Sequence, residues 1–305
     1  MRKTTEEYAV YLGCTIPIKN PSFELSFRMI CEKLGIQLHE MEGASCCPDP
    51  VATLSLNFQT WLALAARNLT IAEEMGKDIV TLCSGCYETL KTAREILLEN
   101  EKFRERVNGV LKELGREFKG TSDVFHFVEI LTRPDILEKI KGMVVHPLKE
   151  MKIGAHYGCH MVRPSKFLDA DDPERPEKLD KLIEAIGGEA VDWSEKMLCC
   201  GYCAKLQPEI GVKLVGEKIE SLQVQVGADC LTVACPACSS QYDVQQRKAA
   251  KEMDVKLETP VIFFTELVAL AIGIPPEKLD LKRRSIKPTK FLQKFESVTG
   301  GGESS

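Results

Sequence analysis

Ten of the 13 cysteines in this 305-residue chain fall into two sets with nearly the same spacing. Each set contains a lone cysteine, then an adjacent pair, then a Cys-x-x-Cys motif. The sets are Cys14, Cys46, Cys47, Cys83 and Cys86, and Cys159, Cys199, Cys200, Cys235 and Cys238. The lone cysteine precedes the pair by 32 residues in the first set and by 40 in the second. Clustered thiolates of this kind bind metals or carry redox chemistry.

Three kinds of cysteine site could explain this pattern: a zinc site, a redox-active dithiol and an iron–sulfur cluster. A structural zinc site takes four ligands, usually from two Cys-x-x-Cys-like motifs, and each set has only one such motif. A thioredoxin-like dithiol at Cys83 and Cys86 leaves the other recurring cysteines unexplained. An iron–sulfur cluster presents several irons, so adjacent cysteines can bind different metals, but the Cys-x-x-Cys-x-x-Cys run of an ordinary cubane is missing. The pattern therefore favours an unusual iron–sulfur cluster.

Composition excludes several other classes of protein. The net charge of −5 is spread along the chain, and no basic stripe indicates a nucleic-acid partner. The N-terminal residues lack the apolar core of a signal peptide. The longest apolar stretches, 61–66 and 261–274, fall short of the roughly 20 residues that span a bilayer. We therefore expect a cytoplasmic protein, and a reducing cytosol favours metal ligands over disulfides.

The cysteines follow short apolar runs that predict β-strands. Four of these strands should end within two residues of a cysteine of the two sets, and they are expected at 8–13, 78–82, 152–157 and 229–234. A further strand is expected at 36–41. Apolar residues at helical spacing predict helices at about 20–34, 54–75, 87–118, 179–187 and 208–226. Strands that alternate with helices indicate an α/β fold.

The second half of the chain repeats the order of the first. We therefore predict two duplicated Rossmann-like α/β units, each with a mostly parallel sheet and a five-cysteine site at the carboxyl ends of its strands. The predicted boundaries are 1–148 for the first domain and 149–281 for the second. A basic tail at 282–305 is expected to be partly disordered, over 297–305 in particular.

At these cysteines the sequence resembles the CCG-domain family, whose motif is a lone Cys, then Cys-Cys-Gly, then Cys-x-x-Cys. With two copies and no fused ferredoxin domain, it resembles the stand-alone catalytic B subunits of soluble heterodisulfide reductases. The resemblance covers about residues 8–270. It implies two noncubane [4Fe-4S] clusters, each held by one of the two five-cysteine sets. Pro48 stands where the motif has glycine, and this departure removes no ligand.

The resemblance also implies a reaction and partners. The family reduces the mixed disulfide of coenzyme M and coenzyme B to two thiols, the last step of methanogenesis, with one electron from each cluster. Its partners are a C subunit with cubane clusters and a flavin-containing A subunit that bifurcates electrons. A hydrogenase or formate dehydrogenase is possible in the larger complex. Other members of the family are iron–sulfur subunits of lactate-, glycolate- or quinone-linked oxidoreductases, and this is the alternative function.

Charged residues near the cysteines are candidates for substrate binding and proton transfer. The two coenzymes are anionic, so we expect cations close to the motifs to bind them, namely Arg163, Lys166, Lys19 and Lys205. A solvated surface charge is the other interpretation of each. His156 and His160 flank Cys159 and are candidate proton donors, with a structural hydrogen-bonding role as the alternative. Of the remaining cysteines, Cys31 and Cys230 are expected in the core, and Cys203 beside the second pair.

Overall fold

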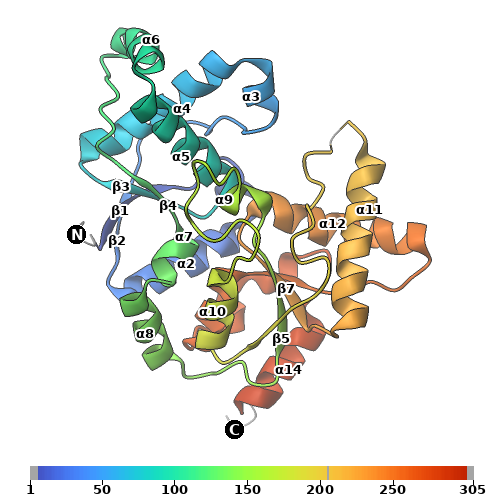
Figure 1. Cartoon of the computed structure of the whole chain (residues 1–305). Helices are drawn as coiled ribbons and strands as arrows, with labels where there is room; N and C mark the ends of the chain where they lie inside the picture. The colour runs from blue at the N-terminus through green and yellow to red at the C-terminus, as the bar shows by residue number, and fades with distance from the viewer. Residues whose placement is uncertain (1–5, 205, 301–305) are drawn as a thin grey trace.

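The computed structural model describes residues 6–204 and 206–300, and they form two α/β units (Figure 1). The first unit contains β1 (Glu7–Tyr11), α1 (Ile16–Lys19), α2 (Pro21–Leu34), β2 (Gln37–Glu40), α3 (Ala52–Leu56), α4 (Phe58–Met75), β3 (Asp78–Thr81), α5 (Ser84–Glu99), α6 (Glu101–Leu111), η1 (Lys112–Leu114), β4 (Val124–His126), α7 (Phe127–Leu131) and α8 (Pro134–Met143).

The second unit repeats this order and adds a C-terminal helix. It contains β5 (Lys152–His156), α9 (Cys159–Val162), α10 (Lys178–Ala185), β6 (Glu189–Val191), α11 (Pro208–Glu220), η2 (Ser221–Gln225), β7 (Cys230–Val233), α12 (Pro236–Met253), β8 (Val261–Phe263), α13 (Phe264–Ala271), η3 (Pro276–Leu279), η4 (Leu281–Arg283) and α14 (Thr289–Thr299). Strand β6 is a short element that the sequence analysis did not predict.

Each unit is built on a four-stranded sheet in which every strand pairing is parallel. The strand order is β2-β1-β3-β4 in the first sheet and β6-β5-β7-β8 in the second. The predicted fold class of two duplicated α/β units is confirmed. In such an order, the chain that follows one central strand crosses to one edge of the sheet, and the chain that follows the other crosses to the opposite edge. The crevice between the carboxyl ends of these two strands is the usual ligand site. That crevice lies between β1 and β3 in one unit and between β5 and β7 in the other.

Local sequence signals explain most of the helix boundaries. Helix α2 begins at Pro21, whose missing N–H costs nothing in the first turn, and it ends at Gly35, which adopts the left-handed conformation with φ 75°. The helix expected over 87–118 is instead two helices, α5 and α6. They separate at Asn100, which has extended backbone dihedrals and caps α6 by accepting a hydrogen bond from Phe103 N. The prediction of a single long helix over 87–118 was therefore wrong.

The two units pack on each other reciprocally. Helix α2 of the first unit contacts α13 of the second, and α10 of the second contacts α7 of the first. Phe23 on α2 stacks on Phe263 with 3.8 Å between ring centroids, and Ser26 Oγ lies 2.6 Å from Thr265 Oγ1. These side chains are all buried, so a continuous core joins the two halves. The position of the boundary near 148 remains a prediction.

Much of the C-terminal tail is ordered against the second unit. Helix α14 buries Phe291 and Phe295, and Lys294 Nζ pairs with Asp229 Oδ2 at 2.7 Å. The helix continues through Thr299, so the first residues of the segment expected to be disordered are helical, whereas 301–305 lie outside the described part of the chain. Among the residues that the structure describes, no helix is both long enough and apolar enough to cross a membrane.

Candidate metal centre

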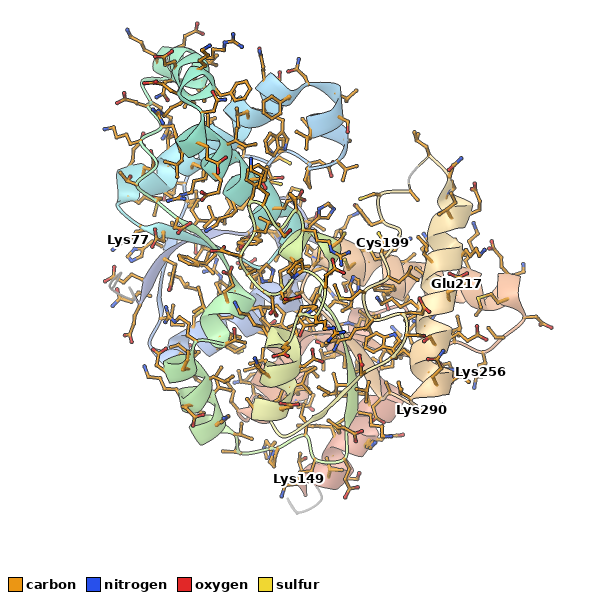
Figure 2. All side chains as sticks on the ribbon, in the orientation of Figure 1. Lys77, Lys149, Cys199, Glu217, Lys256 and Lys290 are labelled. Atoms are coloured by element: carbon orange, nitrogen blue, oxygen red, sulfur yellow. The ribbon has the colours of Figure 1, made fainter. Side chains whose placement is uncertain are left out.

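All ten recurring cysteines line one cavity between the two units. Cys14 follows β1 and Cys83 follows β3, so the first set gathers at the carboxyl ends of the two central strands. Cys159 and Cys235 follow β5 and β7 in the same way. The sequence predicted one site per half, and the structure places both sites on a shared cavity. Figure 2 labels Cys199 in the loop ahead of α11, near the middle of the molecule.

The two Cys-x-x-Cys turns meet at the boundary between the units. Ser84 Oγ, beside Cys83, donates a hydrogen bond of 3.1 Å to the carbonyl of Ala234, the residue before Cys235. His126 Nε2 lies 3.1 Å from the same carbonyl. Because His126 Nδ1 accepts the N–H of Val128, its Nε2 carries the proton and donates to Ala234. Side chains of the first unit therefore fix the position of a ligand turn in the second.

Two glycines near the cysteines allow close packing of the chain. Gly13 has φ 68°, and a Cβ atom there would lie 2.8 Å from Cys86 Sγ. Gly201, which follows the second adjacent pair, has φ 77°, and its Cβ would lie 2.7 Å from the Cα of Gly211. A residue with a side chain would be strained at either position. Pro48 occupies the first-unit counterpart of Gly201, and its carbonyl accepts a hydrogen bond from Thr89 Oγ1 at 3.0 Å.

The donor set fits an iron–sulfur cluster in each half. Five sulfurs per half exceed the four ligands of a zinc site, and they line a cavity in which adjacent cysteines could bind different metals. In the second half, Cys238 Sγ lies 3.4 Å from Cys200 Sγ. A smaller alternative is also present, because ligand atoms of His156, Cys200 and Cys238 lie within 4.8 Å of one another. That group leaves most of the recurring cysteines without a role.

His156 is buried beneath the second site. Its Nε2 lies 3.3 Å from Cys238 Sγ, and its Nδ1 lies 3.4 Å from the hydroxyl of Tyr242. Burial, together with the nearby positive charge of Lys218, holds the pKa of His156 well below its usual value. The neutral ring can accept from Tyr242 and donate toward the Cys238 sulfur. His156 is not among the residues that line the cavity.

His160 lies on the cavity wall and connects the two units. Its Nδ1 contacts Glu88 Oε2 on α5, and its Nε2 lies 4.0 Å from Cys203 Sγ. Burial opposes protonation, but hydrogen bonds with Cys203 and Glu88 outweigh it and raise the pKa of His160 to about 10. Cys203 also lines the cavity, as expected for a cysteine beside the second pair. Glu88 is a site residue that the sequence analysis did not identify.

The three predicted substrate-binding cations that the structure describes do not line the cavity. Arg163 donates to the carbonyl of Pro173, at 2.7 Å from Nη2, and pairs with Glu174. Lys166 Nζ lies 3.4 Å from Glu99. Lys19 is exposed in the last turn of α1. Lys205 lies outside the described residues.

The other expected cysteines lie in the core. Cys31 on α2 and Cys230 on β7 are fully buried and away from the cavity. Burial raises the pKa of both thiols well above its ordinary value, so they stay protonated and unreactive. Two further residues near the site escaped the sequence analysis, Lys218 on α11 and Asn68 on α4. For Lys218 a signal existed, since it lies within the otherwise apolar stripe of Val212, Val215, Ile219 and Leu222.

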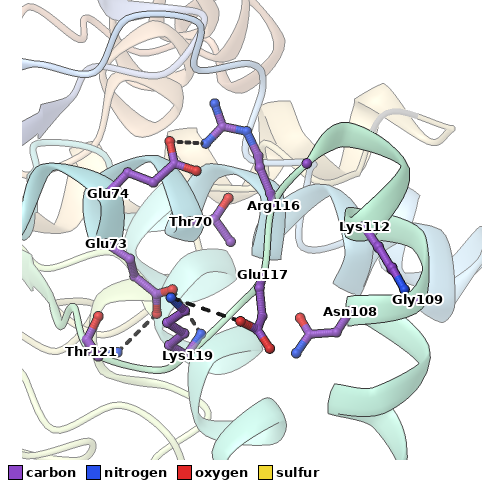
Figure 3. A pocket seen from close by; sticks show the side chains of 11 residues that line it. Thr70, Glu73, Glu74, Asn108, Gly109, Lys112, Arg116, Glu117, Lys119 and Thr121 are labelled. Atoms are coloured by element: carbon purple, nitrogen blue, oxygen red, sulfur yellow. Dashed lines mark hydrogen bonds and ion pairs between the residues drawn. The ribbon is translucent and has the colours of Figure 1, made fainter.

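A larger hollow of about 840 Å³ lies away from the cysteines, against α4 and α6 (Figure 3). Glu73 accepts hydrogen bonds from the backbone N–H groups of residues 119, 120 and 121. Arg116 pairs with Glu74 at 2.7 Å, and Lys119 lies 4.0 Å from Glu117. The charged groups in this hollow anchor a loop, so the cysteine cavity remains the candidate site.

Comparisons with known proteins agree with this choice. A family model described as a cysteine-rich domain, CCG, matches residues 8–91 and 153–243, one copy in each unit. The B subunit of the ferredoxin:CoB-CoM heterodisulfide reductase of Methanosarcina mazei is 34% identical over 296 residues, which are 96% of this chain and 98% of that protein. The 8-methylmenaquinol:fumarate reductase membrane anchor subunit of Wolinella succinogenes is 32% identical and covers 94% of this chain and 99% of its own length.

More distant similarities support the fold. Lactate utilization protein A of Bacillus pumilus is 23% identical over 72% of this chain and 86% of that protein. The crystal structure of a hypothetical protein from Helicobacter pylori superposes with a TM-score of 0.71 at 16% identity, over 92% of this chain and 52% of that one. At this identity the superposition shows a common fold alone.

Proposed function

Because the chain belongs to the cysteine-rich CCG domain family, we propose that it is the catalytic subunit of an iron–sulfur oxidoreductase complex. The proposed reaction reduces the disulfide between coenzyme M and coenzyme B to two thiols. The observation that carries the proposal is the meeting of two five-cysteine sets on one cavity. The relatives named as B subunits of heterodisulfide reductases match nearly the whole chain, which supports this reaction over others in the family.

Each set is proposed to hold one noncubane [4Fe-4S] cluster. Such clusters supply electrons one at a time, so two of them match the two electrons that a disulfide takes up on reduction. The protein's part is to hold two groups of sulfur ligands at one cavity, within reach of the same small substrate. The turns at Ser84 and Ala234, joined by a hydrogen bond, keep the two sites in a fixed relation.

Reduction of a disulfide to two thiols also consumes two protons. We propose that His160 holds one of these protons, and its position on the cavity wall and its contact with Glu88 support this role. His156 is better placed to donate a hydrogen bond to the Cys238 sulfur than to reach a substrate. A proton-transfer role for His160 predicts a loss of turnover in His160→Gln while both clusters are retained.

The anionic ends of the coenzymes are proposed to bind at the rim. The described residues that line the cavity include no lysine or arginine, so charge recognition would fall to residues outside it. Lys19 remains a candidate because it is exposed only a few residues after Cys14. Arg163 and Lys166 are weaker candidates, since both pair with acidic side chains.

Electrons are proposed to arrive from partner subunits, one with cubane clusters and one that contains a flavin. Exposed apolar side chains close in sequence to the ligand cysteines support such an interface. Ile18 is 80% exposed after Cys14, Leu56 is 85% exposed after the first pair, and Leu206 is 98% exposed after the second pair. A contiguous exposed apolar patch is typical of surfaces that bind other proteins, and we propose that these three side chains contribute to such a patch.

A second candidate function is that of an iron–sulfur subunit in a quinone-linked or lactate-oxidising enzyme. The similarity to the Wolinella succinogenes subunit, at 32% identity over nearly the whole chain, favours this alternative most specifically. In that role the clusters would pass electrons without cleaving the coenzyme disulfide.

The test is turnover of the anaerobically purified protein with a reduced viologen as electron donor. We expect viologen oxidation when the coenzyme M–coenzyme B disulfide is added, and none with Cys200→Ala. We also expect a new EPR signal on addition of coenzyme M to the oxidised protein. A protein that contains both clusters but shows neither response would overturn disulfide reduction and favour the second candidate, which oxidation by a menaquinone analogue would then test.

A further inference from the structure

Lys218 is a fully buried lysine behind the second cysteine site. Its Nζ donates three hydrogen bonds, to the carbonyls of Glu195 at 2.8 Å, Lys196 at 2.8 Å and Leu198 at 2.9 Å. These carbonyls belong to the loop that leads directly into Cys199 and Cys200. The side chain has no exposed surface. A single side chain therefore fixes the backbone that presents the adjacent cysteine pair.

The three hydrogen bonds of Lys218 match the donors of a charged ammonium group. An ammonium has three N–H donors, and here each has its own carbonyl acceptor, whereas a neutral amine would leave one acceptor unfilled. Burial lowers the pKa of Lys218 to about 7, and negative charge on Cys238, Cys200 and Cys199 acts in the opposite direction. Additional negative charge at the sulfurs stabilises the ammonium further. The group is thus a buried positive charge beside three of the proposed ligands.

The first unit has a neutral residue at the matching position. Lys218 is the eleventh residue of α11, and Asn68 is the eleventh residue of α4, the corresponding helix. Asn68 Oδ1 accepts the N–H of Ser45 at 2.9 Å, and Asn68 Nδ2 donates to the carbonyl of Cys46 at 3.1 Å. Both residues hold the backbone near an adjacent cysteine pair. Only the residue of the second unit carries a charge.

We infer that Lys218 is a positioning residue whose charge raises the reduction potential of the second cluster, in a way that Asn68 does not raise the first. A cluster gains one negative charge when it accepts an electron from the donor. A fixed positive charge in a low-dielectric interior favours the reduced state, and net charge near a cluster is one of the factors that set its potential. The inference rests on the proposed function, because it requires a cluster in each unit.

The test compares reduction potentials of the intact anaerobic protein, measured by redox titration with EPR detection. Lys218→Gln removes the charge and keeps N–H donors for the loop, Lys218→Met removes both, and Lys218→Arg keeps the charge. Lys213→Met is the matched control, since Lys213 is an exposed lysine on the same helix, with a side chain 77% exposed. Signals are assigned with Cys47→Ala and Cys200→Ala, each of which disrupts one site.

We expect Lys218→Gln to lower the reduced-to-oxidised ratio of the second cluster at least tenfold at a fixed solution potential. For a one-electron couple this is a shift of about 59 mV. The first cluster should keep its potential, as should both clusters in Lys213→Met and Lys218→Arg. Loss of the second cluster from Lys218→Met and Lys218→Gln, with retention in Lys218→Arg, would show that the charge is needed to hold the cluster and would overturn a role limited to its potential.

Equal potentials with lysine, glutamine and methionine at position 218 would overturn the inference while leaving the proposed function intact. A purely structural role predicts that result, because holding the loop does not by itself change the charge at the cluster. If the unmodified protein contained no iron and no acid-labile sulfide, the proposed function itself would be overturned. Metal analysis of the unmodified protein before the titration separates these two failures.

Discussion

The two cysteine sites repeat the same backbone plan in different surroundings. In both, a lone cysteine follows a central strand, an adjacent pair lies in a loop, and a Cys-x-x-Cys motif opens a helix. The residue three positions before the lone cysteine is Tyr11 in the first unit and His156 in the second. Four positions after the last cysteine stand Leu90 and Tyr242.

In the proposed assignment, this difference separates the residues that hold each cluster from the residues that tune its potential. The five cysteine positions recur in both units, so both sites offer the same donor atoms. Around them, the first site has a phenol, an aliphatic side chain and the neutral Asn68, whereas the second has an imidazole against Cys238, a phenol against that imidazole and the buried Lys218. Two chemically inequivalent sites on one cavity suit the proposed substrate, a mixed disulfide whose two sulfur atoms end on two different thiols.

The largest expected effect comes from removing one cysteine of an adjacent pair. Cys47→Ala and Cys200→Ala should each lose about half of the bound iron and sulfide, because each disrupts the ligand set of one cluster. Cys31→Ala is the control, since that thiol is buried in α2 away from the cavity. Loss of all iron from either variant would show that the sites are not independent.

The packing between the units should contribute the next largest effect. Phe23→Ala removes a buried ring that stacks on Phe263, so we expect unfolding to require about 3–5 kcal/mol less free energy. Leu25→Ala on the same helix is the control, since Leu25 is 39% exposed and should change stability by less than about 1 kcal/mol. Chemical denaturation of the metal-free protein measures both, and equal effects would contradict a shared core.

The junction between the units should also make stability depend on pH. Burial lowers the pKa of His126 to about 4, against an ordinary value of 6.5, although its hydrogen bond to Ala234 opposes this shift. Between these values the unfolded chain binds a proton that the folded chain does not, so stability falls as the pH falls from 6.5 to 4, by about 3 kcal/mol.

The corresponding residue of the second unit is Phe263, the last residue of β8 as His126 is of β4, and it does not titrate. His126→Gln should therefore flatten this part of the pH profile, as measured by denaturation at several pH values. If the free energy of unfolding of His126→Gln depended on pH as steeply as that of the unmodified protein, the pH dependence would come from another group.

The smallest effect is expected at the neutral counterpart of Lys218. Asn68→Ala leaves the N–H of Ser45 and the carbonyl of Cys46 without their partner, which should cost about 1–3 kcal/mol of stability. Gln59→Ala, at an exposed position of the same helix, is the control and should be close to neutral. If Asn68→Ala also shifted the potential of the first cluster strongly, charge would not be what distinguishes the two positions.

The fold and the gathering of each cysteine set at the ends of its central strands were predictable, because strands that end close to cysteines and a duplicated pattern are features of the sequence. The helix break at Asn100 was not predicted, since apolar and charged residues continue on both sides of it and the break depends on the extended backbone and the side-chain cap of this one residue. The substrate-binding cations were predicted because they lie close to the cysteines in the sequence. Arg163 and Lys166, however, pair with acidic side chains from other segments of the chain. Glu88 reaches His160 only because the two units pack together, which no local pattern encodes.

The most direct test of two equivalent ligand sets is the iron and acid-labile sulfide content of the protein purified under strict anaerobiosis. Two four-iron clusters predict about eight irons and a comparable amount of sulfide per chain. One or two zinc ions per chain without sulfide would contradict the account, since it would mean that the cysteines build a structural metal site and that no electrons pass through the cavity.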